Sequence, residues 1–122
     1  MDIEKLRKQL EIDEGIVHEI YLDHLGYPTF GIGHLVRESD PEHGADVGTA
    51  INETRCIEVF NEDVETVIKD CKILYPDFDD LPEEVQQIVA NKMKQWLEKF
   101  KIWLKEGNPN NKAPQYLSGK KK

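Results

Sequence analysis

The sequence lacks any run of eighteen apolar residues, which is about the length that a helix needs to cross a bilayer. Its first ten residues, MDIEKLRKQL, also lack the apolar core of a secretory signal peptide. We therefore expect a chain that spans no membrane and is made without a signal peptide. Its 122 residues, 39% of them hydrophobic and 33% charged, suit one folded globular domain.

Cysteine is scarce, with only Cys56 and Cys71 in the chain. Both lie in one predicted helix, where fifteen residues span about 22 Å, too far for a disulfide bond. We expect two reduced, buried thiols. Neither cysteine has a neighbouring histidine in the sequence, so a thiol nucleophile is disfavoured.

Motifs for metals and nucleotides are absent as well. The segment GIGHLV has no third glycine of a dinucleotide-binding loop. Four histidines show neither the i, i+4 spacing of a zinc site nor a C-x2-C partner: His18, His24, His34 and His43. The sequence therefore predicts no metal and no cofactor.

Charge is distributed unevenly along the chain. Residues 1–91 hold 7 basic and 22 acidic side chains, whereas residues 92–122 hold 9 lysines and 2 glutamates. The acidic bulk argues against nucleic acid as the main partner. The basic end predicts a binding tail or a segment of different origin.

The first third of the chain predicts a helix followed by a small hairpin or meander. Apolar residues spaced three and four apart indicate a helix that ends at Gly15 in a left-handed cap. Alternation over 17–22 predicts a strand, 23–26 a turn, and 27–32 a second strand. Pro28 would place that second strand at a sheet edge.

Two long helices follow a polar loop over 37–50. Asn52 is the predicted N-cap of the first helix, and residues 80–82 begin the second. The first apolar stripe contains Ile57, Phe60, Val64, Val67, Cys71 and Leu74. The second contains Val85, Ile88, Val89, Met93, Trp96, Leu97, Phe100, Trp103 and Leu104. The order of elements predicts an α+β fold that is mostly helical.

The basic, aromatic stretch 92–106 admits three interpretations. Its apolar stripe can pack back on the preceding long helix, which is the usual role of such stripes. It can instead dock on anionic lipid or a cell-wall polymer. It can also pair with a second copy of the chain, so that the protein is a monomer or a dimer.

Two carboxylates suggest chemistry. A glycosidase needs one carboxylic acid to protonate the leaving oxygen and a second carboxylate beside the sugar. Glu14 is predicted at a helix end and Asp23 in a turn, with Thr29 on the returning strand and close backbone approach at Gly31 and Gly33. In a chain with 24 acidic residues, solvated surface charge is the alternative.

The same region closely resembles the active-site lobe of the phage-type (T4-like) lysozymes. The shared residues are DEG at 13–15, IYLD at 20–23, Gly26-Tyr27, Thr29 and GIGHL at 31–35. The match continues in order and spacing to about residue 91. It implies one compact, lysozyme-like unit in four parts: an active-site lobe (1–52), a long connecting helix (53–75), a reduced helical C-terminal lobe (76–107) and a loose basic tail (108–122).

The resemblance also implies roles for individual residues. Glu14 would be the general acid, Asp23 the second carboxylate acting on water with inversion, and Thr29 would hold that water. Leu35 would lie near the saccharide cleft. Structural support would come from Asp13 and from a contact of His34 with Asp63. The implied activity is hydrolysis of the β-1,4 bond between N-acetylmuramic acid and N-acetylglucosamine in peptidoglycan. The implied location is the cytoplasm of an infected bacterium, where other proteins open access to the wall.

After Asn91 the sequence departs from the family. The family holds its acid with an arginine from late in the chain, but the last arginine here is Arg55, so that partner is predicted to be missing. Lys94 stands where the family has a cleft phenylalanine. The alternative function is therefore a truncated or redesigned lobe with little or no activity, acting as a scaffold, a cell-wall binder or a cationic membrane-active protein.

Overall fold

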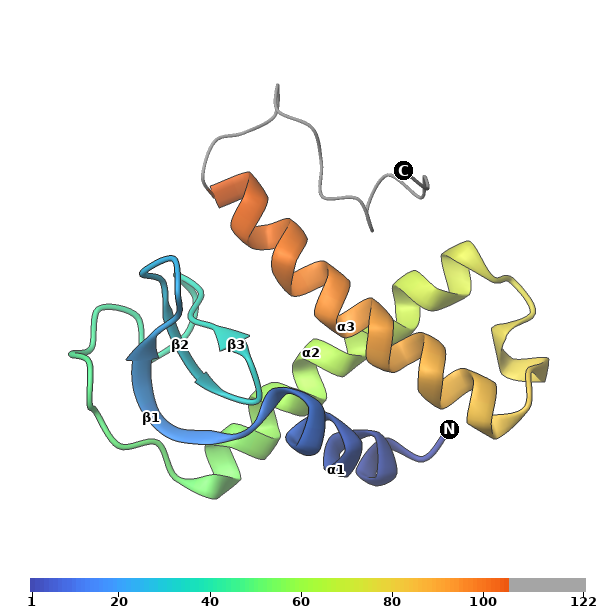
Figure 1. Ribbon diagram of the computed structural model, residues 1–122, viewed down its shortest axis with the longest axis horizontal. Coiled ribbons are helices and arrows are strands. Elements are labelled where there is room, and N and C mark those ends of the chain that lie inside the picture. Colours follow the sequence, from blue (N-terminus) through green and yellow to red (C-terminus); the bar gives the residue numbers. More distant parts are fainter. Residues whose placement is uncertain (106–122) are drawn as a thin grey trace.

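The computed structural model describes residues 1–105 as an α+β fold dominated by helix (Figure 1). The predicted tail, 108–122, lies outside these residues. In chain order the elements are α1 (Ile3–Glu14), β1 (Val17–Leu22), β2 (Pro28–Gly31), β3 (His34–Leu35), α2 (Glu53–Leu74), the 3-10 helix η1 (Phe78–Asp80) and α3 (Glu83–Lys105). The predicted fold class is confirmed.

Helix α1 begins where Asp2 accepts a hydrogen bond from the Lys5 N–H at 3.0 Å. It buries Leu6 and Leu10 completely. The predicted left-handed cap at Gly15 is only half right, because φ is +81° but ψ is 170°. An extended ψ carries the chain straight into β1 instead of curling it back over the helix end.

The sheet has the order β1-β2-β3 with antiparallel pairs, so β2 is the central strand. The prediction that Pro28 marks an edge is therefore wrong. Pro28 is the first residue of β2, a position at which a strand tolerates the missing N–H. Its carbonyl still accepts a hydrogen bond from the Val36 N–H at 3.0 Å. The two-residue strand β3 gave no recognisable sequence signal.

Helix α2 begins as predicted, with Asn52 accepting a hydrogen bond from the Arg55 N–H at 2.8 Å. The predicted stripe is buried except at its ends, since Leu74 is exposed and Ile57 only partly buried. Cys56 and Val59 are buried in their place. The face shifts because the first half of α2 packs on the sheet and the second half on α1 and α3.

The buried apolar side chains form two clusters, and α2 contributes residues to both. One joins the three helices: Leu6, Leu10, Ile32, Phe60, Val64, Val67, Cys71, Phe78 and Ala90. The other lies between α2 and the sheet: Ile20, Phe30, Val36, Ile51, Cys56 and Val59. Both cysteines are free and buried, as predicted. Burial raises the pKa of the Cys71 thiol to about 11, which makes a thiolate nucleophile unfavourable.

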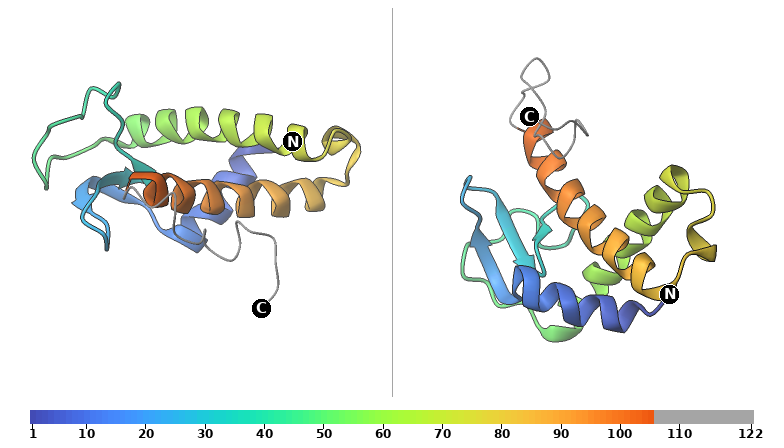
Figure 2. Two further views of the ribbon diagram at one scale, coloured as in Figure 1. Left: turned by 90° about the horizontal axis from the view of Figure 1, so that it is seen from above. Right: turned by 45° about the vertical axis from the view of Figure 1, so that its right-hand side comes forward.

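Helix α3 crosses α2 in Figure 1, and the view from above in Figure 2 shows the two helices as stacked layers. The predicted stripe of α3 is partly wrong, because Val85 and Ile88 are exposed. The face that turns inward carries polar side chains as well as apolar ones: Gln86, Ala90, Asn91, Met93, Lys94 and Leu97.

The first interpretation of the stretch 92–106 is supported for two residues of its stripe, whereas Leu104 at the end of the stripe is exposed. Met93 and Leu97 pack against the helical cluster. The rings of Trp96 and Phe100 stack at 5.6 Å between centroids, and those of Phe100 and Trp103 at 5.9 Å. Lipid binding and pairing with a second copy stay predictions. Within the described residues, no helix is long and apolar enough to cross a bilayer.

Candidate active site

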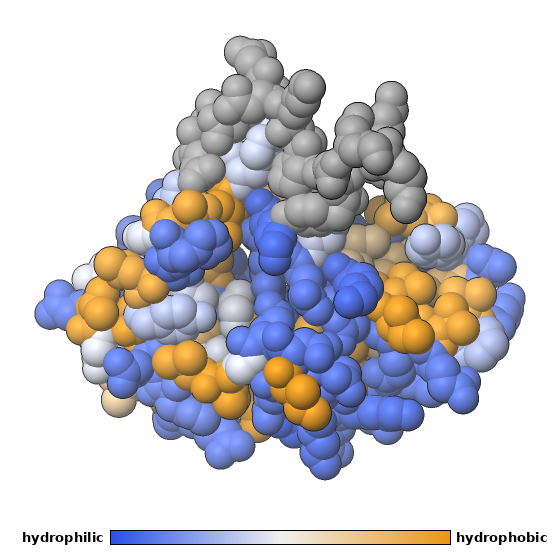
Figure 3. Space-filling model, viewed as in Figure 1, coloured by the Kyte–Doolittle hydropathy of each residue, from blue (hydrophilic) through white to orange (hydrophobic). Residues whose placement is uncertain are grey.

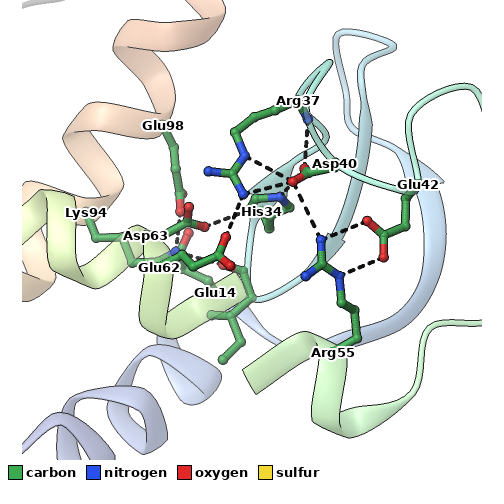
Figure 4. Close-up of polar contacts among 11 residues, drawn as sticks. Glu14, His34, Arg37, Asp40, Glu42, Arg55, Glu62, Asp63, Lys94 and Glu98 are labelled. Atoms are coloured by element: carbon green, nitrogen blue, oxygen red, sulfur yellow. Dashed lines mark hydrogen bonds and ion pairs between the residues drawn. The ribbon is translucent and has the colours of Figure 1, made fainter. Parts of the chain in front are cut away.

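Glu14 is the last residue of α1, and the helix carries its carboxyl group against α3 (Figure 4). The side chain is 14% exposed. Its Oε2 accepts a hydrogen bond from Lys94 Nζ at 3.2 Å, across 80 residues of sequence. The predicted acid is therefore close to solvent but held by a buried cation.

No arginine follows Arg55 in the sequence, but Lys94 gives Glu14 a different cationic partner from late in the chain. The Lys94 side chain is only 2% exposed. Nζ also donates to the carbonyl of Ile32 at 2.7 Å and to the carboxyl group of Glu98. Burial lowers the pKa of this ammonium, but the charges of Glu98 and Glu14 raise it more, so Lys94 stays charged. Nζ also lies over the ring of Phe60, 5.8 Å from its centroid.

Glu98 is a second acid at Glu14 that the sequence analysis missed. It lies one turn after Lys94 on α3, and its side chain is 22% exposed. Burial, followed by a hydrogen bond with Glu14, raises the pKa of Glu98 above its ordinary value, and Lys94 only partly opposes this. The only sequence signal was the i, i+4 spacing of Lys94 and Glu98, which is common on solvated helices.

Gly33 makes room for both carboxyl groups. A Cβ atom built at this position would lie 2.9 Å from Glu14 Oε1 and 3.1 Å from each carboxyl oxygen of Glu98. Its φ of +65° also favours glycine. The close approach predicted at Gly31 is not found, because a Cβ there would meet Cys56 at 3.6 Å, an ordinary van der Waals distance.

Asp23 begins the turn between β1 and β2. Its Oδ1 accepts hydrogen bonds from the N–H groups of Leu25 and Tyr27, each at 2.9 Å. The Asp23 carbonyl accepts a third bond, from Gly26 N–H at 2.9 Å. This Asx-type turn holds the carboxylate in one orientation.

Thr29 lies on β2 directly opposite Tyr21 of β1 and is 5% exposed. Its hydroxyl donates a hydrogen bond to the Tyr27 carbonyl at 2.9 Å. With its proton engaged there, the Thr29 oxygen offers a water molecule an acceptor lone pair.

Tyr21, which was not predicted as a site residue, interacts electrostatically with both predicted carboxylates. Burial raises the pKa of its hydroxyl, and the negative charges of Asp23, Glu98 and Glu14 raise it further. Both predicted carboxylates therefore act on the same hydroxyl group. The alternation of β1 could have indicated Tyr21, because it shares a sheet face with Thr29.

His34 lies between two carboxylates. Nδ1 is 2.7 Å from Asp63 Oδ2, the predicted contact, and Nε2 is 2.7 Å from Asp40 Oδ2, which was missed. Asp40 also accepts hydrogen bonds from Arg37. Burial raises the pKa of Asp40, but the bonds from Arg37 and His34 lower it more, to about 2. This group joins β3, the following loop and α2.

Asp13 and Leu35 lie at the border of the site. Asp13 accepts hydrogen bonds from Gln9 at 3.1 Å and from Asn91 at 2.9 Å, which ties α1 to α3. Leu35 lines a cavity of about 20 Å³ together with Gly33 and Glu98. Such a volume has space for about one water molecule.

A helix that ends on Glu14, a small antiparallel sheet and a long connecting helix together form a lysozyme-like α+β fold. The model of the phage lysozyme family matches residues 11–76, more than half of the chain. The chain therefore belongs to the phage lysozyme family. A search of curated proteins gave no significant match. Among residues 1–105, no group of three or more His, Cys, Asp and Glu side chains is placed to hold a metal ion.

Proposed function

We propose that this protein is a muramidase, which hydrolyses the β-1,4 bond between N-acetylmuramic acid and N-acetylglucosamine in peptidoglycan. The observation that carries the proposal is the family match over residues 11–76, which includes Glu14, Asp23 and Thr29. A lysozyme of this family implies peptidoglycan as the substrate. The charges of Glu14 and Asp23 on Tyr21 support a shared site for the two acids.

In the proposed reaction, Glu14 gives its proton to the glycosidic oxygen as the bond from this oxygen to the anomeric carbon breaks. The leaving oxygen keeps the bonding electron pair, and positive charge develops on the sugar ring. Asp23 takes a proton from a water that Thr29 holds, and the resulting hydroxide attacks from the opposite face. The product is therefore inverted at the anomeric carbon. Solvent then returns the proton from Asp23 to Glu14.

Lys94 supports the role of Glu14 as acid. Once Glu14 has lost its proton, the buried ammonium lies 3.2 Å from the new carboxylate and stabilises it. Lys94 therefore supplies the function that the family obtains from its arginine. No cofactor takes part in this proposal. Synthesis in the cytoplasm of an infected bacterium and action on its wall complete the proposed role.

The test is the release of reducing ends from purified, lipid-free peptidoglycan, followed together with loss of turbidity. The parent chain should clear the suspension and release reducing ends. Glu14→Gln should be slower by about 10²- to 10⁴-fold, because the proton donor is gone. Glu19→Gln is the matched control, since Glu19 is exposed on β1. Equal rates for the parent and Glu14→Gln, or no reducing ends from either, would contradict the proposal.

A binder without catalysis is the second candidate, and the small cavity beside Glu98 favours it. A space for about one water beside Glu98, Gly33 and Leu35 leaves no volume there for a sugar ring unless α3 moves. This candidate predicts that the chain sediments with peptidoglycan, releases no reducing ends, and binds equally well as Glu14→Gln.

A further inference from the structure

The reaction proposed above gives no role to the contact between Glu14 and Glu98. Two different helices bring these carboxyl groups together: Glu14 ends α1, and Glu98 lies about two turns before the end of α3. Both meet over the bare backbone of Gly33, and both accept a hydrogen bond from Lys94. Figure 4 shows the two side chains converging on the lysine from opposite sides.

The balance of charge at this contact favours one proton on the two carboxyl groups. Two ionised carboxylates in contact in a poorly solvated space repel each other, and one proton between them replaces the repulsion with a hydrogen bond. With Lys94 charged, a pair that holds one proton also makes the buried group neutral as a whole. In the aspartic proteases, two carboxyl groups placed against each other share one proton in this way.

We propose that Glu98 is a positioning residue that shares one proton with Glu14, so that Glu14 enters the reaction with this proton available. The inference rests on the proposed muramidase function for its catalytic meaning. When Glu14 donates to the glycosidic oxygen, the proton leaves the pair. Two carboxylates then remain in contact with Lys94, until solvent restores the proton. Glu98 itself does not touch the substrate.

Other charged and titratable groups face the pair from every element packed around it. Asp63 on α2 is bound to His34 of β3, so its charge is partly compensated. The remaining groups lie on β1 and its turn and on α3: Tyr21, Asp23 and Lys101. The acidic members of this set favour retention of the shared proton, and Lys101 opposes it.

The first experiment needs no substrate. Carboxyl ¹³C resonances of glutamate in the full chain are followed by NMR from pH 3 to pH 9 and assigned with Glu14→Gln and Glu98→Gln. In the parent, the pair should keep one proton far above the ordinary glutamate pKa of about 4.3. In Glu98→Gln the second carboxyl group is gone, so no proton should be retained above the ordinary glutamate range. If both carboxyls of the parent ionise in the ordinary range, the proposal is overturned, and the parent titration decides this even if a variant fails to fold.

The second experiment measures the pH profile of kcat/KM on soluble peptidoglycan fragments. A group that must be protonated loses activity as the pH rises through its pKa, so a lower pKa moves the alkaline limb to lower pH. We expect Glu98→Gln to move this limb by about one unit or more, which is about a tenfold loss at neutral pH that recovers at acid pH. Glu84→Gln, exposed on the same helix, should leave the profile unchanged. A uniform loss at all pH values would assign Glu98 a merely structural role and overturn the proposal.

The two experiments separate this inference from the function on which it rests. An inactive parent that still holds the shared proton in the NMR titration refutes the muramidase and leaves the proton-sharing pair standing. An active parent whose two carboxyls ionise normally refutes the pair and leaves the muramidase standing.

Discussion

Two groups of buried charges lie near each other, one around His34 and Asp40 and the other around Lys94, and they differ in how many donors each carboxylate has (Figure 4). Asp40 accepts hydrogen bonds from the Arg37 backbone and side chain and contacts His34, so its pKa falls to about 2. Glu98 shares Lys94 with Glu14, and its pKa rises. Burial is common to both groups. The supply of donors decides whether a buried carboxyl group becomes a structural anion or holds a proton.

Most charged side chains of the described residues lie on the protein surface rather than in these two buried groups. In the space-filling view, hydrophilic side chains gather over the middle of the face, with apolar side chains to both sides (Figure 3). Charges on such a surface are solvated and contribute little each. The informative charges are therefore the few that the fold has removed from water.

The largest effect is expected from Lys94→Met, which keeps the stem and removes the cation. Two buried carboxyl groups then lack their donor, which should lower the free energy of unfolding by about 3–5 kcal/mol at neutral pH. Burial already holds the pKa of Glu98 above its ordinary value, and removal of the ammonium would raise it further. Stability should therefore recover as the pH falls and the carboxyls take up protons. Urea unfolding at pH 7.5 and pH 5 measures this, with exposed Lys92→Met as the control. An equal loss at both pH values would contradict the electrostatic explanation.

Gly33→Ala should have the next largest effect. Its Cβ would collide with Glu14 and Glu98, and the positive φ adds strain, for about 3 kcal/mol in all. Gly44 also has a positive φ, of +85°, but open space around its Cβ position. Gly44→Ala should therefore lower the free energy of unfolding only through backbone strain, by about 1–2 kcal/mol. Thermal unfolding of the two variants isolates the collision, and equal losses would show that the carboxyl groups simply move aside.

Asp40→Asn should cost about 2 kcal/mol at neutral pH, because one pKa unit corresponds to about 1.4 kcal/mol and the pKa of Asp40 is lowered to about 2. A depressed pKa gives stability that is present above the unfolded value and is lost as the pH falls through the folded one. The parent should therefore lose this contribution between about pH 4 and pH 2, whereas the variant has none to lose. Urea unfolding across that range tests the difference, with exposed Glu38→Gln as the control.

Glu62→Gln should have the smallest effect. Glu62 contacts Arg37 at 2.8 Å, but the two side chains are 47% and 41% exposed. Solvent screens such a pair, so we expect a change below about 1 kcal/mol, and smaller still in high salt. Chemical denaturation at two salt concentrations measures it. A loss as large as that of Asp40→Asn would show that the outer contact matters as much as the buried one.

The elements that the sequence predicted well have local causes. Asn52 caps α2 through its own side chain, three residues from its donor. The alternation over residues 17–22 marks β1 because side chains of a strand face opposite sides in turn. Pro28 was misplaced because an edge or a central position depends on β3, which is too short to leave a pattern.

The candidate site also contains residues that local sequence predicts and residues that it does not. Glu14, Asp23 and Thr29 lie within sixteen residues and could be proposed together from their spacing and resemblance to the phage lysozymes. Lys94 and Glu98 could not, because no local pattern links them to a helix end that lies 80 residues away. Lys94, which in the sequence weighed against catalysis, donates a hydrogen bond to Glu14 in the folded chain.

The sequence by itself determined the helices, the first hairpin strand and the family, since capping groups, periodicity and motif spacing act over a few residues. Only the tertiary structure decided which charges lie away from water and which of them share a donor. Burial and contact between distant helices are properties of the folded chain: they bring Glu14 and Glu98 onto the one ammonium of Lys94 and raise the pKa of Glu98.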